Sequence, residues 1–349
     1  MIDLQKLVRT NIRELISCAE TKVEENVRDS QHIMLDANEN PYNKPFNRYP
    51  SDNQTEIKEE LAKLKGVTPK DIFLSNGSTE AIDMCYRIFC QSKVDNVVAV
   101  EPTCELYKHF ARLNDIEYRS VLLDEEFQLN ATELLKACDK HTKLVWLCSP
   151  NTPSGNVLNV EEVEKVLKGF DGIVVIDEAY ADFTRLQTFR ERISEFSNLI
   201  VLNTFSKAWA SAAIRLGVVY AQEAIISIFN KVSNPYHISQ LTQNQGLDAL
   251  KHRYDIEDWI KILLLERKRM IIAFESLACC EKVYPSNANF FLAKMKDAQS
   301  VYDYLCEKGI YVRNCSNMSL CGNCLRITIG SKAENAEILG LLRCYKPTK

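Results

Sequence analysis

Residues 198–217 read NLIVLNTFSKAWASAAIRLG, and this stretch decides how the chain is interpreted. The apolar run at its start has the length of a buried strand, and small and polar residues follow at once. Lys207 lies in this second part, between Ser206 and Ala208, and Arg215 follows eight positions later. A solvated lysine needs no such neighbours, so the rest of the chain must show whether Lys207 takes part in chemistry.

The composition is that of a large globular chain. It has 349 residues, 46% of them hydrophobic, which allows a sizeable core and favours two domains. The net charge of −4, from 43 basic and 47 acidic side chains, argues against a partner made of nucleic acid. Residues 1–20 carry charges where a signal peptide needs an apolar run, and no apolar run is long enough to cross a bilayer. We therefore expect a soluble, cytoplasmic protein without membrane contact.

The chain contains thirteen cysteines and no secretory signal, so we expect reduced thiols rather than disulfides. Cys321 and Cys324 form a CxxC pair with Cys315 just upstream, which suggests a zinc site. A structural zinc ion takes four ligands, and no second CxxC or close histidine completes this set. We therefore predict buried thiols and no bound metal.

Strand-sized apolar runs alternate with helical patterns between about residues 70 and 235. This alternation is typical of a mostly parallel sheet covered by helices. A long helical pattern follows over residues 256–277. After it, the pattern becomes strand, helix, two strands and helix, which indicates a smaller α+β domain. The sequence thus predicts an α/β fold with two domains.

Polar residues follow several predicted strands, at the edge where open α/β sheets bind ligands. Pyridoxal phosphate needs a lysine for a Schiff base and a carboxylate for its ring nitrogen. Asp177 ends a buried strand, where an unpaired carboxylate would be costly, and a protonated ring nitrogen would offset that cost. Helix N-terminal amides, hydroxyls and a cation would hold the phosphate. The candidate residues are Ser78, Thr79, Cys104, Asn151, Asp177, Tyr180, Ser206, Lys207 and Arg215.

Each of these residues also has an ordinary interpretation. Asp177 with Glu178 resembles a helix cap or a magnesium-binding pair, and a lysine such as Lys207 is most often a solvated side chain. The order and spacing of the set favour the cofactor site. Asp177 comes 26 residues after Asn151, Lys207 another 30 residues on, and Arg215 another 8.

The segments SPNTPSG (149–155), VVIDEAY (174–180) and TFSKAWASAAIRLG (204–217) resemble the signatures of fold-type I pyridoxal-phosphate aminotransferases. Within that group, the chain is similar to the histidinol-phosphate aminotransferase family. The segments that carry this similarity, in order and spacing, are LDANENPY (35–42), NRYP (47–50), SNGSTEAID (75–83), PSNANFFLAK (285–294), YVRN (311–314) and CLRITIG (324–330). The resemblance implies a mostly parallel seven-stranded sheet in a large domain and a smaller α+β domain.

The resemblance also implies an organisation and a role for each residue. It implies a homodimer with an N-terminal arm over residues 1–30 that joins the small domain and the dimer interface. The large cofactor domain would span residues 31–240 and the small domain residues 241–349. Tyr49 would reach the cofactor and substrate of the neighbouring subunit, and Asn38 would contact substrate.

Around the cofactor, Lys207 would form the Schiff base and then move the substrate proton. Asp177 would hold the ring nitrogen, and Asn151 and Tyr180 the ring oxygen, with Asn151 also near the substrate. The phosphate would lie against Ser78, Thr79, Ser206 and Arg215. Cys104 would lie against the ring, where the family usually has a tyrosine, and Cys18 also stands near a position where the family commonly has tyrosine.

In the small domain, Arg326 would bind the glutamate carboxylate in one half-reaction and the substrate phosphate in the other, where Arg313 would assist. The reaction implied moves an amino group between L-histidinol phosphate and 2-oxoglutarate, giving imidazole acetol phosphate and L-glutamate, in histidine biosynthesis. The alternatives are an aromatic amino acid aminotransferase, a phosphothreonine-type decarboxylase, or a cofactor-binding paralogue without turnover. A nicotinamide-dependent oxidoreductase is disfavoured because no GxGxxG motif follows a strand.

Overall fold

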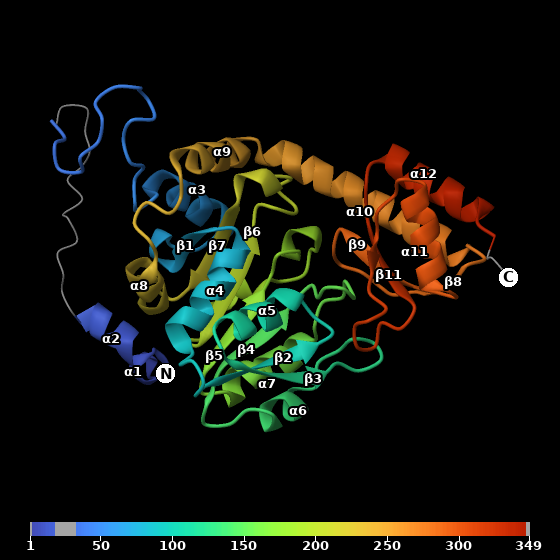
Figure 1. Ribbon diagram of the computed structural model, residues 1–349, viewed down its shortest axis with the longest axis horizontal. Helices are drawn as coiled ribbons and strands as arrows, with labels where there is room; N and C mark the ends of the chain where they lie inside the picture. The colour runs from blue at the N-terminus through green and yellow to red at the C-terminus, as the bar shows by residue number, and fades with distance from the viewer. Residues whose placement is uncertain (1, 18–32, 347–349) are drawn as a thin grey trace.

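The computed structural model describes residues 2–17 and 33–346 and contains a larger and a smaller β-sheet (Figure 1). The larger sheet has seven strands in the order β1-β7-β6-β5-β4-β2-β3. The strands from β3 to β6 pair in parallel, whereas β7 runs antiparallel to both β6 and β1. The sheet is therefore mostly parallel, as predicted. Its strands are β1 (Ile72–Asn76), β2 (Asn96–Glu101), β3 (Glu117–Leu122), β4 (Thr142–Cys148), β5 (Ile173–Asp177), β6 (Leu199–Thr204) and β7 (Leu216–Ala221).

Helices cover both faces of this sheet, which explains why its central strands are apolar along their whole length. Side chains of β2 alternate between two hydrophobic clusters: Val97 and Ala99 belong to one, and Val98 and Val100 to the other. The first cluster includes residues of α4 (Ser78–Phe89), α5 (Glu105–Leu113) and α8 (Glu223–Val232). The second includes residues of α3 (Thr55–Lys65), α6 (Ala131–Lys136) and α7 (Val160–Gly169).

The smaller sheet has the order β10-β11-β9-β8, with every pair antiparallel. Its elements are β8 (Cys280–Val283), β9 (Phe290–Met295), α11 (Ala298–Glu307), β10 (Arg313–Asn314), β11 (Cys324–Thr328) and α12 (Lys332–Cys344). The predicted strand, helix, two strands and helix are present. Strand β8 was not predicted, because two of its four residues are exposed and charged and give no apolar run.

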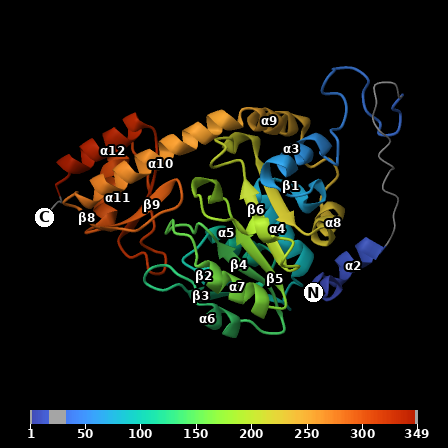
Figure 2. The same cartoon turned by 180° about the vertical axis from the view of Figure 1, so that it is seen from behind.

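Helices α9 (Gln240–Lys251) and α10 (Arg253–Glu275) run from the larger sheet to the smaller one, as Figures 1 and 2 show. Met270 and Phe274 of α10 belong to the hydrophobic cluster of the smaller sheet. The predicted division at residue 240 falls at the first residue of α9, and it stays a prediction. In the described ranges, no helix combines the length and apolar character needed to span a membrane.

The N-terminal helices α1 (Leu4–Leu7) and α2 (Thr10–Ser17) pack on the larger domain. Val8 and Ile12 join the cluster under α4 and α8, and the Ile2 amide donates to Ser197 Oγ at 3.3 Å. The predicted contact of residues 1–30 with the small domain stays a prediction. Short 3-10 helices complete the loops: η1 (Pro69–Asp71), η2 (Ala181–Phe183), η3 (Phe189–Arg192) and η4 (Ala212–Ile214).

Candidate active site

The loop that joins β6 to β7 carries Lys207. Lys207 Nζ lies 5.7 Å from the centre of the Tyr180 ring, which follows the neighbouring strand β5. Lys207 keeps solvent contact, but the walls around it desolvate its ammonium, and the Arg326 guanidinium repels it. Both effects lower the pKa of Lys207. A lysine with a lowered pKa is a better nucleophile and base at neutral pH than a solvated one.

Asp177 ends β5 and is only 5% exposed. Its Oδ2 accepts a hydrogen bond from the Tyr107 hydroxyl at 2.8 Å, and its Oδ1 accepts one from the Ala179 amide at 3.0 Å. Burial raises the pKa of Asp177, while these two donors and Lys207 favour its charged form. A buried carboxylate held this way can pair with a protonated ring nitrogen.

Tyr107 is a functional candidate that the sequence interpretation missed. It is fully buried on α5, and its ring stacks on Trp146 with a centroid distance of 4.7 Å and an angle of 15°. Its position in the sequence could have indicated a role in the site. Tyr107 comes three residues after the candidate Cys104, in the helix after β2, so the two side chains lie one helix turn apart. A tyrosine on the apolar face of an amphipathic helix usually serves only to pack in the core. The sequence pattern alone therefore could not show that Tyr107 also contacts Asp177.

A group of hydroxyls, amides and one guanidinium converges where β1 meets α4. Arg215 Nη1 donates to Ser206 Oγ at 3.2 Å. Gly77, at φ 75°, precedes the first residue of α4, and a Cβ there would overlap the Arg215 guanidinium. A Cβ on Gly217 would likewise overlap the backbone between Gly77 and Ser78. These glycines let the α4 N-terminus, Ser206 and Arg215 come together as an anion cradle.

This cradle contains Ser78 and Thr79, the first two residues of α4, as well as Ser206 and Arg215. Arg215 precedes its strand rather than following one. It reaches this edge because β7 runs antiparallel to β6, so the start of β7 lies beside the end of β6. The structure therefore brings together all four residues predicted to hold a phosphate.

Asn151 is fully buried behind the site, and its side chain is engaged with protein groups. Its Nδ2 donates to the Pro102 carbonyl at 3.0 Å and to Ser154 Oγ at 2.8 Å, and its Oδ1 accepts from Thr103 Oγ1 at 2.9 Å. To donate a hydrogen bond to a ring oxygen of the cofactor, Asn151 Nδ2 would have to give up one of its two present acceptors. That contact stays a prediction.

Cys104 and Tyr180 line the site as half-buried side chains. Cys104 is the N-cap residue of α5, and burial raises the pKa of its thiol to about 12, with Asp177 adding to the effect. The Cys104 thiol is therefore protonated at neutral pH. Tyr180 meets the edge of Phe290, a residue of β9, with a centroid distance of 5.0 Å. Burial also raises the pKa of Tyr180, so its hydroxyl keeps its proton.

Arg313 and Arg326 lie directly opposite each other on β10 and β11. Arg326 Nη1 donates to Thr152 Oγ1 at 2.8 Å, and the guanidinium lies 5.3 Å from the centre of the Phe290 ring. Arg313 Nη2 forms an ion pair of 2.6 Å with Glu105 Oε2. The Arg326 contact runs from the small sheet to the loop after β4, and the Arg313 contact runs to the first residue of α5. The two arginines therefore lie at the junction of the two domains.

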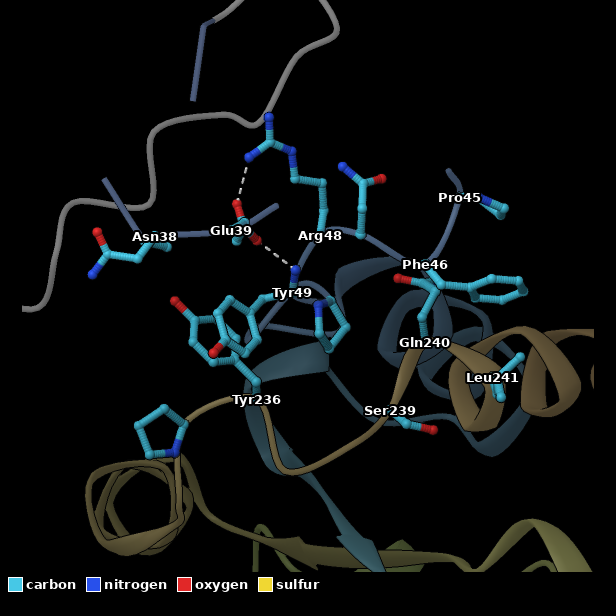
Figure 3. Close-up of a pocket in the computed structure, with 14 residues that line it drawn as sticks. Asn38, Glu39, Pro45, Phe46, Arg48, Tyr49, Tyr236, Ser239, Gln240 and Leu241 are labelled. Carbon is cyan, nitrogen blue, oxygen red and sulfur yellow. Dashed lines mark hydrogen bonds and ion pairs between the residues drawn. The ribbon is translucent and has the colours of Figure 1, made fainter. Parts of the chain in front are cut away.

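Asn38 and Tyr49 line a separate surface pocket of about 560 Å³ (Figure 3). The Tyr49 ring stacks on Tyr236 with a centroid distance of 4.6 Å, and the Tyr49 amide donates to Glu39 Oε1 at 2.6 Å. Among the described residues that line this pocket, none belongs to the group around Lys207. Within one chain, these two predicted residues are therefore not part of the lysine site.

Cys315, Cys321 and Cys324 are buried in a hydrophobic cluster of the core. In the parts of the chain that the structure describes, no three His, Cys, Asp or Glu side chains are grouped so that they could hold a metal ion. Cys18 lies outside the described residues.

A family model described as aminotransferase class I and II matches residues 19–342. The chain therefore belongs to the aminotransferase class I and II family, which confirms the resemblance and the enzyme class predicted from its signature segments. A relative from Bacteroides thetaiotaomicron is named histidinol-phosphate aminotransferase. It is 49% identical to this chain over 346 residues, which cover 99% of this chain and 100% of the relative.

Two solved structures show the same fold. The histidinol-phosphate aminotransferase of Clostridium acetobutylicum has a TM-score of 0.79 and 24% identity, over 86% of this chain and 90% of that one. The enzyme of the same name from Sinorhizobium meliloti, in complex with pyridoxal-5'-phosphate, has a TM-score of 0.77 and 20% identity, over 85% and 82%. The predicted fold class is thereby confirmed.

Proposed function

We propose that this protein is a pyridoxal-phosphate-dependent aminotransferase that moves an amino group between L-histidinol phosphate and 2-oxoglutarate. It would act in histidine biosynthesis, in the cytoplasm, as a homodimer. The observation that carries the proposal is the grouping of Lys207, Asp177 and the anion cradle beside two arginines of the small domain. Family membership and the relatives' names support the same reaction.

The residues present fit the cofactor. The ring nitrogen would pair with Asp177, whose two oxygens are already oriented by protein donors. The phosphate would lie in the cradle that Gly77 and Gly217 keep free of side chains. When bound, pyridoxal phosphate supplies an electron sink that stabilises negative charge on the substrate α-carbon. Lys207 Nζ would be the amine that attaches the cofactor to the chain.

Lys207 is also the group that would move a proton at the substrate α-carbon. A general base works best when its pKa lies near the operating pH, and the site lowers the pKa of Lys207 toward that range. Tyr180 stands beside Lys207 with a protonated hydroxyl that can donate a hydrogen bond to the ring oxygen. Tyr180 would thus orient the cofactor ring, and Lys207 would transfer the proton.

Arg326 would bind the glutamate carboxylate in one half-reaction and the phosphate of L-histidinol phosphate in the other. Among the described residues, its guanidinium contacts the neutral Thr152 hydroxyl and the Phe290 ring, and no carboxylate lies within ion-pair distance of it. A guanidinium fork pairs with two oxygens, so it suits a carboxylate and a phosphate equally. Arg313, opposite it on the sheet, would add a second positive charge for the phosphate.

The homodimer is proposed because Tyr49 and Asn38 lie outside the lysine site of their own chain. Their pocket is formed by the segment from residue 37 to 50 together with residues 235–241. A second subunit would place this segment over the neighbouring lysine site, where Tyr49 would contact the cofactor and the substrate, and Asn38 the substrate. Figure 3 shows Asn38 and Tyr49 of this segment lining the pocket together with Tyr236, Ser239 and Gln240.

A substrate panel tests the proposal. Holoenzyme mixed with L-histidinol phosphate alone should show the absorbance change of the amino half-reaction, and 2-oxoglutarate should reverse it. Aromatic amino acids should react more slowly, because they carry no phosphate for Arg313. Release of carbon dioxide from phosphothreonine without need for 2-oxoglutarate would replace the proposal with a decarboxylase. Cofactor binding with no response to any amino donor would indicate a paralogue without turnover.

A further inference from the structure

The two arginines at the domain junction differ in their partners. Arg313 is paired with a carboxylate, since its Nη2 lies 2.6 Å from Glu105 Oε2. Arg326 donates instead to the neutral hydroxyl of Thr152 at 2.8 Å. Arg326 therefore keeps its charge available for a ligand, whereas the charge of Arg313 is already partly neutralised by the chain itself.

We propose that Glu105 is an internal competitor for the substrate phosphate at Arg313. In the ligand-free protein it occupies the guanidinium, and a bound phosphate displaces it. This inference rests on the proposed function, because it assigns a specificity role to a residue beside the proposed substrate arginine. Because of Glu105, Arg313 would bind a phosphate in preference to a carboxylate, whereas Arg326 would bind either anion.

The physical reason is a difference in charge between the two ligands. Glu105 competes intramolecularly, at the high effective concentration that tethering provides. A substrate carboxylate would replace one carboxylate by another and gain little from Arg313. A phosphate monoester carries a charge of about −1.5 to −2 at pH 7 and three acceptor oxygens, so it gains from the exchange. The pair therefore selects between the two anions that one site must accept.

The position of Glu105 allows this exchange. Its side chain is 67% exposed and that of Arg313 is 57% exposed, so both can move without opening the core. Glu105 is the first residue of α5, where the helix dipole stabilises a carboxylate that has left its partner. Exposed ion pairs are weak, so the competition should change phosphate affinity by about two- to five-fold.

The variant Glu105→Gln tests the inference, with Glu126→Gln as its matched control. Glu126 also links the two domains, through an exposed ion pair of 3.2 Å with Lys282, but it touches neither arginine. The ligand is imidazole acetol phosphate, which the enzyme cannot aminate while its cofactor lacks the amino group. Titration calorimetry of the holoenzyme then reports binding without turnover.

We expect Glu105→Gln to bind this ketone about two- to five-fold more tightly and Glu126→Gln to bind it like the wild type. In an Arg313→Gln background, Glu105→Gln should have no effect. Arg313→Gln alone should weaken binding of the ketone and leave binding of glutarate, a dicarboxylate, unchanged. Unchanged or weaker ketone binding by Glu105→Gln overturns the inference. So does an Arg313→Gln variant that loses as much affinity for glutarate as for the ketone.

Failure of the proposed function would look different. In that case the wild type would neither bind the ketone nor react with L-histidinol phosphate, and the inference would fall with it. A wild type that does both, together with an inert Glu105→Gln variant, would refute the competitor role alone.

Discussion

Tyr107→Phe is the sharpest test of how the site holds its buried carboxylate. The change removes only the hydroxyl that donates to Asp177 Oδ2 at 2.8 Å. The ring of Tyr107 is fully buried and stacked on Trp146, so phenylalanine should keep the packing. Asp177 would retain one donor, the Ala179 amide at 3.0 Å. Because the lost donor favours the charged carboxylate, its removal should raise the pKa of Asp177 further.

The size of the effect follows from the type of bond lost. A hydrogen bond to a charged group contributes roughly 1.5–3 kcal/mol. If that contribution is needed to keep Asp177 ionised against the cofactor, pyridoxal phosphate affinity should fall by about ten- to a hundred-fold. The assay is reconstitution of the apoenzyme, followed by the absorbance of the bound cofactor at increasing cofactor concentration. Urea unfolding of the apoenzyme shows whether stability has changed as well.

Tyr86→Phe provides the matched control. Tyr86 is also fully buried and stacked on Trp146, at 5.5 Å, but its hydroxyl donates to the Tyr107 carbonyl at 2.7 Å and not to Asp177. We expect it to cost some stability and to leave cofactor affinity unchanged. Wild-type cofactor affinity in Tyr107→Phe, or an equal loss in Tyr86→Phe, would refute the reasoning.

Four further substitutions test the two substrate arginines, Cys104 and Glu178. Arg326→Leu should weaken both half-reactions by roughly 2–4 kcal/mol of transition-state binding, whereas Arg313→Leu should affect chiefly the phosphate half; stopped-flow absorbance of each half-reaction separates them. Cys104→Tyr should tighten cofactor binding by about ten-fold or less through ring stacking, and selective loss of the amino-donor half would show instead that Cys104 makes room for a different substrate. Burial raises the pKa of Glu178 to about 8, so the folded protein holds a proton that the unfolded chain releases above its ordinary pKa of 4.5. Stability should therefore fall by about 1.4 kcal/mol for each pH unit between those values. Glu178→Gln should flatten this fall in thermal melts, and an identical slope in both proteins would contradict the role of Glu178.

Features that depend on local pattern could be predicted from the amino-acid order alone. Buried strands need apolar residues on both faces, so the runs ending at Asp177 and Thr204 could be found without a structure. Residues at or just beyond the carboxyl end of a parallel strand lie at the ligand-binding edge, and this rule pointed to Asp177 and Lys207. The order and spacing of these residues indicated the family that the comparisons then confirmed.

Tertiary structure decided everything that depends on which distant segments meet. Arg215 belongs to the cradle only because β7 is antiparallel, and the sequence of β7 does not state its direction. The Arg313–Glu105 pair joins residues 208 positions apart, and its existence depends on how the small sheet sits on the large one. Tyr107 became a partner of Asp177 only once α5 was placed against the sheet. Hydrophobic periodicity records whether a side chain is buried, but not which polar atom it meets there, because that contact is set by register and packing between elements far apart in the chain.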